Sequence, residues 1–96
     1  MNPNIPAPDG LPPRELNLYE KILVQLKPEV DTMFYNGYLK QAEQFSLTDD
    51  LLTIGIDDQH KREWLADRAG ARIRQLASGI SGRVMKVEFI YVGEMF

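Results

Sequence analysis

Apolar residues recur every three to four positions soon after a proline-rich start, which is the spacing of one face of a helix. Leu18, Ile22 and Leu26 lie four residues apart. Asn17 stands before them as a residue that caps helix N-termini, and Glu20 follows three residues later as its reciprocal partner. The pattern predicts a first helix that begins after Asn17.

A proline and another capping residue predict a break followed by a second, short helix. Pro28 removes a backbone donor and crowds the preceding turn, so it can interrupt the first helix. Asp31 can cap the second helix, and the Asn36-Gly37 pair can end it. We expect the two helices to form a tight hairpin.

Residues 39–47 and 51–56 are separated by a polar turn, and we interpret them as the two strands of a β-hairpin. In the second strand the large apolar side chains alternate with smaller ones, as they do when one face of a strand is buried. These side chains belong to Leu52, Ile54 and Ile56. We expect this strand to be buried on one face only.

The longest helical pattern follows Asp57 and Asp58, whose side chains can cap it, and it runs to about Ser78. Its apolar residues are spaced by about 3.6 positions and include Trp64, Leu65, Ala69, Ile73, Leu76 and Ile80. Gly70 costs roughly 1 kcal/mol relative to alanine inside a helix, so we expect either a kink or a division into two helices there. Trp64 is interpreted as a core residue.

Residues 83–92 alternate between apolar and polar side chains, which predicts a final strand. The order of elements is helix, helix, strand, strand, helix, strand, without repeated strand-helix units. We therefore predict an α+β domain over residues 17–93, in which a three-stranded sheet packs on helices. Residues 1–16 are expected to form a flexible proline-rich segment, and residues 94–96 a short tail.

The composition fits one small domain. The 96 residues are enough for one core and too few for a catalytic domain with a separate binding domain. The absence of cysteine excludes disulfides and thiolate metal sites. No stretch approaches the roughly 18 apolar residues of a membrane span, and no secretion signal is recognisable, so we expect a cytoplasmic protein without membrane contact.

The charge is unevenly distributed along the chain. Residues 1–58 hold ten acidic and four basic residues, whereas residues 59–96 hold four acidic and seven basic ones, and the net charge is −3. This balance is too acidic for a dedicated nucleic-acid binder. The basic residues are interpreted as a solvated helix face, and the alternative is a surface for single-stranded nucleic acid. That surface would include Lys61, Arg62, Arg68 and Arg72.

The sequence offers little for covalent chemistry. The phosphate-binding loop GxxxxGK[ST] is absent, and the glycine cluster of residues 78–83 lacks its lysine. His60 is the only histidine, and its spacing to other residues indicates neither a metal site nor a Ser-His-Asp triad. We expect no enzymatic activity, no cofactor and no metal.

Several aromatic and aliphatic residues form an ordered set along residues 17–93. The set consists of Leu18-Tyr19, Leu23, Leu26, Tyr35, Tyr38, Leu52-x-Ile54, Trp64-Leu65 and Val87-x-Phe89. In order and spacing it resembles the N-terminal domain of the bacterial replication initiator DnaA. The resemblance implies a compact KH-like fold that recruits the replicative helicase, binds small regulators of initiation, self-associates through its first helix and binds single-stranded DNA weakly at most.

The resemblance also implies which residues contact partners. Tyr19 stands where the family usually has the tryptophan used in self-association, while Phe34 and His60 stand where helicase contacts are expected. With Glu20 and Leu23 they form the predicted partner-binding set. Tyr19 and Phe34 are expected on the polar flanks of their helices, and two interpretations of them stay open: they pack in the core, or they dominate a protein contact.

Two hypotheses for the function follow. The leading one is a non-catalytic protein-interaction module of DNA replication initiation. The alternative is a KH-like domain that binds single-stranded nucleic acid through its long basic helix, although the sequence lacks the GXXG loop of KH domains. The chain also departs from the family pattern, because Tyr38, Asp57-Asp58 and His60 replace the usual tryptophan, Pro-Asn and phenylalanine.

Overall fold

The computed structural model describes residues 15–93. The proline-rich segment expected over residues 1–16 lies outside the described part, apart from its last two residues. The tail expected at residues 94–96 also lies outside it.

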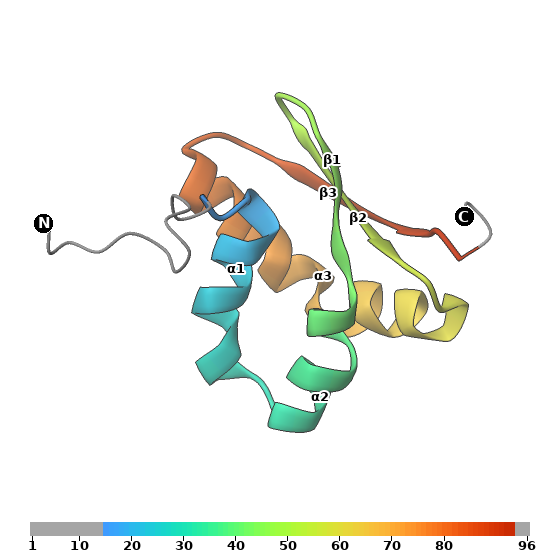
Figure 1. Cartoon of the computed structure of the whole chain (residues 1–96). Coiled ribbons are helices and arrows are strands. Elements are labelled where there is room, and N and C mark those ends of the chain that lie inside the picture. Colours follow the sequence, from blue (N-terminus) through green and yellow to red (C-terminus); the bar gives the residue numbers. More distant parts are fainter. Residues whose placement is uncertain (1–14, 94–96) are drawn as a thin grey trace, which may run out of the picture.

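The described residues form an α+β fold with the predicted order of helices and strands (Figure 1). The helices are α1 (Leu18–Leu26), α2 (Thr32–Gly37) and α3 (Gln59–Ser81), and the strands are β1 (Glu43–Leu47), β2 (Leu51–Ile56) and β3 (Lys86–Tyr91). Two short 3₁₀ helices, η2 (Lys27–Glu29) and η3 (Leu39–Gln41), join them. The strand expected over residues 39–47 is therefore wrong in its first part, where the chain is helical.

Side-chain caps fix where the first two helices begin. Asn17 accepts a hydrogen bond from the backbone N–H of Glu20 at 2.8 Å, and the Glu20 carboxylate accepts one from the backbone N–H of Asn17 at 2.9 Å. Asp31 accepts from the backbone N–H groups of Met33 and Phe34 at 2.9 and 3.2 Å. Both predicted helix starts are confirmed, because each side chain satisfies donors that have no partner within the helix.

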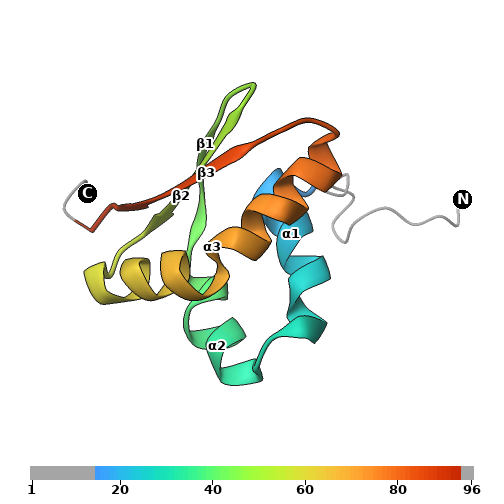
Figure 2. The same cartoon turned by 180° about the vertical axis from the view of Figure 1, so that it is seen from behind.

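The strands form one mixed sheet in the order β1-β2-β3. β1 and β2 are antiparallel and joined by a short turn, whereas β3 runs parallel to β2. A parallel pair needs a long crossover connection, and α3 provides it. Helices α1 and α3 lie on the same side of the sheet, as Figures 1 and 2 show from opposite directions.

The core fills the space between the sheet and these two helices. Its fully buried side chains include Ile22, Leu26, Leu52, Ile54, Ile56, Leu65 and Ile73. The predicted inner face of β2 is thus confirmed. The expectation that β2 is buried on one face only is wrong, because Thr53 and Gly55 on the other face are buried as well. A Cβ atom on Gly55 would lie 2.9 Å from Val92 Cγ1 and 3.6 Å from Phe45, so these two side chains cover the outer face there.

Helix α3 is one continuous helix of 23 residues, and its axis bends between its two halves (Figures 1 and 2). Of the two alternatives expected at Gly70, the division into two helices is wrong. The helix ends at Gly82, which adopts a left-handed conformation with φ of 77°. This end lies beyond Ser78, and Gly79 is an interior residue of the helix.

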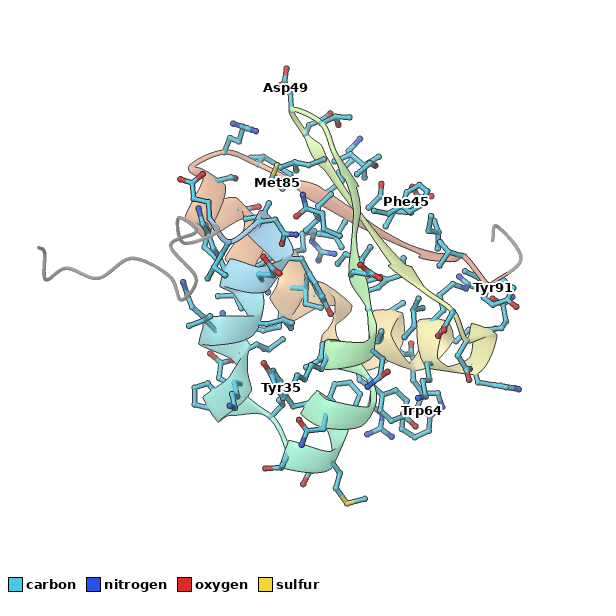
Figure 3. All side chains as sticks on the ribbon, in the orientation of Figure 1. Tyr35, Phe45, Asp49, Trp64, Met85 and Tyr91 are labelled. Carbon is cyan, nitrogen blue, oxygen red and sulfur yellow. The ribbon has the colours of Figure 1, made fainter. Side chains whose placement is uncertain are left out.

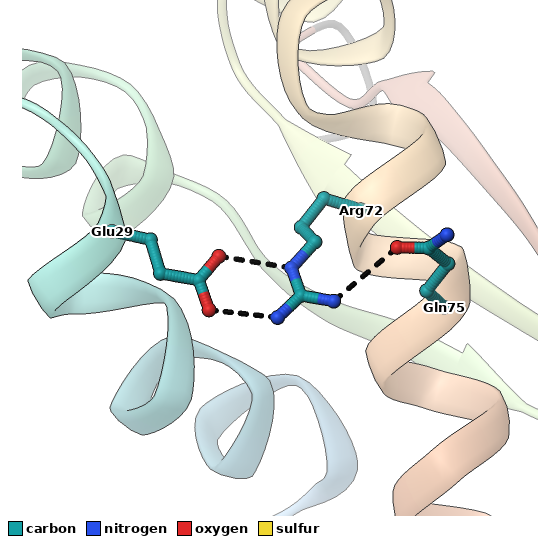
Figure 4. A network of polar contacts seen from close by, with 3 residues as sticks. All are labelled: Glu29, Arg72 and Gln75. Carbon is teal, nitrogen blue, oxygen red and sulfur yellow. Dashed lines mark hydrogen bonds and ion pairs between the residues drawn. The ribbon is translucent and has the colours of Figure 1, made fainter.

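A charged pair ties η2 to α3 (Figure 4). The guanidinium of Arg72 donates to the two carboxylate oxygens of Glu29 at 2.9 and 2.7 Å, and to Gln75 Oε1 at 3.2 Å. The hydrogen bonds from Arg72 hold the pKa of the Glu29 carboxyl below its ordinary value. Both side chains are exposed, so the pair positions η2 more than it stabilises the domain.

Candidate functional site

Tyr19 is a core residue. Its side chain is 1% exposed, and its hydroxyl donates a hydrogen bond to the carbonyl oxygen of Leu39 at 2.7 Å. Burial raises the pKa of the Tyr19 phenol above its ordinary value. The expected position on a polar flank is therefore wrong. The reason is that Tyr19, Ile22 and Leu26 are spaced by three and four residues, which places them on the one face of α1 that meets the core.

The other predicted residues of α1 lie nearer the surface. Leu23 is half-buried, and Glu20 belongs to the N-terminal cap. Both line a groove of about 520 Å³ between α1 and the segment that joins η3 to β1. The apolar side chains that α1 and its lead-in expose are Val24, at 64%, and Leu16, at 43%.

Three aromatic rings form a row between α2 and α3. The rings of Phe34 and Tyr38 stack with centroids 5.1 Å apart, and the rings of Tyr38 and Trp64 tilt against each other at 5.8 Å. Phe34 and Tyr38 lie four residues apart, so the end of α2 brings both rings to one side. Trp64 meets Tyr38 from the second turn of α3. Ring pairs at these distances stabilise the fold in addition to the stabilisation that comes from burying their apolar surface.

Two cations flank the row. The Nζ atom of Lys61 lies 5.5 Å from the centre of the Tyr38 ring, and the guanidinium carbon of Arg68 lies 4.1 Å from the centre of the Trp64 ring. Such contacts stabilise by about 0.5–1 kcal/mol each when they are exposed. They also place the two positive charges beside the aromatic row.

These residues border an open groove of about 720 Å³, which we call the ring groove. Its lining consists of Val30, Asp31, Met33, Phe34, Gly37, Tyr38, Lys61, Trp64 and Arg68. Trp64 is 44% exposed and lies on the side of α3 away from the sheet (Figure 3). The interpretation of Trp64 as a core residue is therefore wrong. Met33 is 79% exposed, which adds a flexible apolar side chain to the rim.

The structure separates the five residues predicted to bind partners. Tyr19 is in the core, Glu20 and Leu23 line the groove beside α1, and Phe34 lines the ring groove. His60 is exposed in the first turn of α3 and is not part of the ring groove lining. The predicted set therefore does not form one surface, and only Phe34 belongs to the ring groove.

The four residues of the candidate nucleic-acid surface are also divided. Lys61 and Arg68 flank the aromatic row. Arg62 donates to Gln59 at 3.0 Å and lies 3.9 Å from the Glu63 carboxylate, while Arg72 is paired with Glu29. Two of the four charges are thus partly neutralised by neighbours in this conformation.

Sequence reasoning missed the contribution of Trp64 to this groove, although a signal was present. Lys61, Trp64 and Arg68 have the spacing i, i+3, i+7, which places them on one face of a helix. An aromatic residue between two cations on one face is unlike the purely apolar stripe of a core helix. That difference could have marked the face as exposed.

Within residues 15–93, no group of three or more His, Cys, Asp or Glu side chains could hold a metal ion. None of the helices in this part of the chain is both long and apolar enough to traverse a lipid bilayer.

No known protein-family model matches the chain. The fold and the groove define its class as a small α+β domain that exposes an aromatic groove flanked by cations.

Proposed function

We propose that this domain is a non-catalytic protein-interaction module that binds its partner in the ring groove. The observation that carries the proposal is the exposure of Trp64 in an open apolar groove, beside Phe34 and Tyr38. Tryptophan and tyrosine are enriched among the residues that dominate binding energies, and apolar surface of this kind is covered in many proteins by a partner.

The resemblance to the N-terminal domain of DnaA supplies the biological context of the proposal. The module acts in the cytoplasm during DNA replication initiation, and its partner is the replicative helicase or a regulator of initiation. Self-association through α1 would use Val24 and Leu16, since these side chains are exposed whereas Tyr19 is not. Weak single contacts suffice for such a module when several copies act together.

Single-stranded nucleic acid is the second candidate for the ring groove. Aromatic rings on which bases stack, combined with cations, are typical of proteins that bind single strands. The net charge of −3 and the pairing of Arg72 with Glu29 weaken this candidate. Binding of this kind would fall steeply with salt concentration.

The test is a binding measurement with the purified replicative helicase of the same host, by biolayer interferometry on the immobilised domain. Trp64→Ala should weaken binding by about tenfold or more, because a buried aromatic at the centre of an interface contributes about 2 kcal/mol or more. Phe45→Ala is the matched control, since Phe45 is 49% exposed, similar to Trp64, and lies over Gly55 on the outer face of the sheet. Unchanged binding by folded Trp64→Ala would exclude the ring groove.

A further inference from the structure

We propose that the ligand of the ring groove is an acidic amphipathic helix, whose apolar face covers the aromatic row and whose carboxylates pair with Lys61 and Arg68. This inference rests on the proposed function, because it names the chemistry of the partner that the groove binds. The observation that supports the inference is the arrangement of the two cations around Trp64.

The cations have the spacing of a helical ligand. Lys61 and Arg68 are seven residues apart on α3, which corresponds to two turns and about 10.5 Å along the helix axis. Trp64 lies between them on the same face. A second helix packed along α3 repeats its own side chains with the same period, so carboxylates seven residues apart on the ligand can meet both cations at once.

The opposite wall can accept apolar side chains. Met33 and Phe34 of α2 border the groove, and a Cβ atom added to Gly37 would meet nothing within 4 Å, so the backbone there leaves open space. Anchors at successive turns of a helix could therefore enter between α2 and α3, as amphipathic helices do in apolar grooves.

The charges of the groove select an acidic ligand. No carboxylate among residues 15–93 forms an ion pair with Lys61 or Arg68, whereas Arg72 is paired with Glu29. The carboxylate of the groove, Asp31, is engaged in capping α2. Two available cations match two carboxylates. A nucleic-acid strand would need a longer row of cations to gain the affinity that comes from releasing counterions.

The experiment uses the tryptophan fluorescence of the domain, because Trp64 is its only tryptophan. The probe is a helical peptide of about 14 residues, or about four turns, which contains neither tryptophan nor tyrosine. It carries leucine at three successive turns and two glutamates seven residues apart on the flank of the leucine face. A second peptide has lysine in place of both glutamates, and a third has the acidic sequence scrambled.

The acidic peptide should change the Trp64 fluorescence and bind at least about tenfold more tightly than the lysine peptide, as expected for two charge pairs beside an apolar contact. The double variant Lys61→Glu, Arg68→Glu should reverse this preference. The scrambled peptide should not bind. Circular dichroism checks that the variant is folded, and Arg74→Glu with Arg83→Glu gives a control with the same change in net charge away from the groove.

Equal affinity for the acidic and lysine peptides, or no binding of either below about 1 mM, would overturn the inference. Saturation of the same fluorescence change by oligothymidylate at physiological salt, with no response to the acidic peptide, would overturn it in favour of nucleic acid. In each case the helicase measurement with Trp64→Ala tests the proposed function separately from the ligand class. If that variant loses helicase binding while the peptides fail, the proposed function holds and only the ligand class is wrong.

Discussion

The hydroxyl group of Tyr19 is the polar end of a side chain that the core encloses. It donates to the carbonyl oxygen of Leu39, while the backbone N–H of Tyr19 donates to the side chain of Gln44 at 3.0 Å. One residue thus connects α1 to η3 and to β1. Removing only the hydroxyl would leave a buried carbonyl oxygen without this partner, and removing the ring would leave a cavity.

Substitutions at Tyr19 should therefore act on stability. Tyr19→Phe should lower the free energy of unfolding by about 0.5–1.5 kcal/mol, the net contribution of one hydrogen bond, because the Leu39 carbonyl oxygen still accepts from the backbone N–H of Ala42. Tyr19→Ala should lower it by about 3–5 kcal/mol, the usual cost of truncating a large buried aromatic. Urea denaturation followed by circular dichroism measures both. A Tyr19→Ala domain as stable as the unchanged one would contradict the buried position.

Trp64 and Leu65 show why the sequence predicts a core helix but not its exposed rings. Adjacent residues on a helix point about 100° apart, so only one of the two can face the centre of the core. Leu65 shares its face with Ala69, Ile73 and Leu76, and all four are buried. Hydrophobicity alone does not separate the two. What separates them in the sequence is the pair of cations, Lys61 and Arg68, that shares the helix face of Trp64 and not that of Leu65.

The end of α3 contains two glycines with opposite roles. Gly79 lies inside the helix, where a Cβ atom would meet nothing within 4 Å. Gly82 caps the helix with φ of 77°, a conformation that residues with a Cβ atom adopt only at a cost. At both sites there is open space for a Cβ atom. The effects of alanine at Gly79 and Gly82 therefore differ only because the backbone conformation at the two sites differs.

Alanine at the two positions should shift stability in opposite directions. Gly79→Ala should raise the free energy of unfolding by about 0.5–1 kcal/mol, because alanine has the higher helix propensity. Gly82→Ala should lower it by about 1 kcal/mol, because of the left-handed conformation. Thermal and urea denaturation of the two variants side by side measure the difference. A shift of equal sign at both sites would contradict the assigned helix end.

The pair of Glu29 and Arg72 should contribute to the pH dependence of stability. The pKa of Glu29 lies below its ordinary value of 4.5 in the folded domain, because Arg72 donates hydrogen bonds to the carboxylate. Between these two values the unfolded chain binds more protons than the folded one, so this contribution is present above the ordinary value and is lost as the pH falls.

Glu29→Gln should therefore flatten the fall in the free energy of unfolding as the pH drops from about 4.5. Arg72→Gln should flatten it in the same way, since Glu29 then titrates near its ordinary value. Urea denaturation at a series of pH values measures the slope for each variant. A slope unchanged in both variants would show that the pair does not persist in solution.

The boundaries that the sequence predicts correctly are those set by local chemistry. Asn17 with Glu20, and Asp31, cap helices because their oxygen atoms satisfy nearby backbone donors, which requires no knowledge of the rest of the fold. The burial of β2 on both faces was missed, because it depends on Phe45 and Val92, which come from other parts of the chain. The local pattern of apolar and polar residues does not predict contacts between distant segments.

The domain as a whole combines one continuous core with a peripheral helix. The core joins α1, α3 and the inner face of the sheet, and Phe45 and Val92 lie over the outer face of β2 at Gly55. Helix α2 has no fully buried residue, and it is held by the half-buried rings of Phe34, Tyr35 and Tyr38. The proposed binding surface is thus formed partly by a helix without fully buried residues, as is common for elements that respond to ligands.

This arrangement predicts that α2 opens without unfolding of the core. The backbone N–H groups of Tyr35 and Tyr38, both bonded within or at the end of α2 at 2.9 Å, should exchange with solvent through a local opening. Their exchange should depend weakly on low concentrations of denaturant, because little surface is exposed when a helix of six residues detaches. The N–H groups of β2 should exchange only through global unfolding, with a steep dependence.

Native-state hydrogen exchange followed by NMR over a series of denaturant concentrations separates the two classes. Phe34→Ala should accelerate exchange in α2 more than in β2, because it removes the ring that stacks on Tyr38, which in turn contacts Trp64 of α3. If the α2 and β2 groups instead showed one common free energy of exchange at every concentration, α2 would be part of the cooperative core. The ring groove would then be a rigid surface, and binding could not be coupled to the ordering of α2.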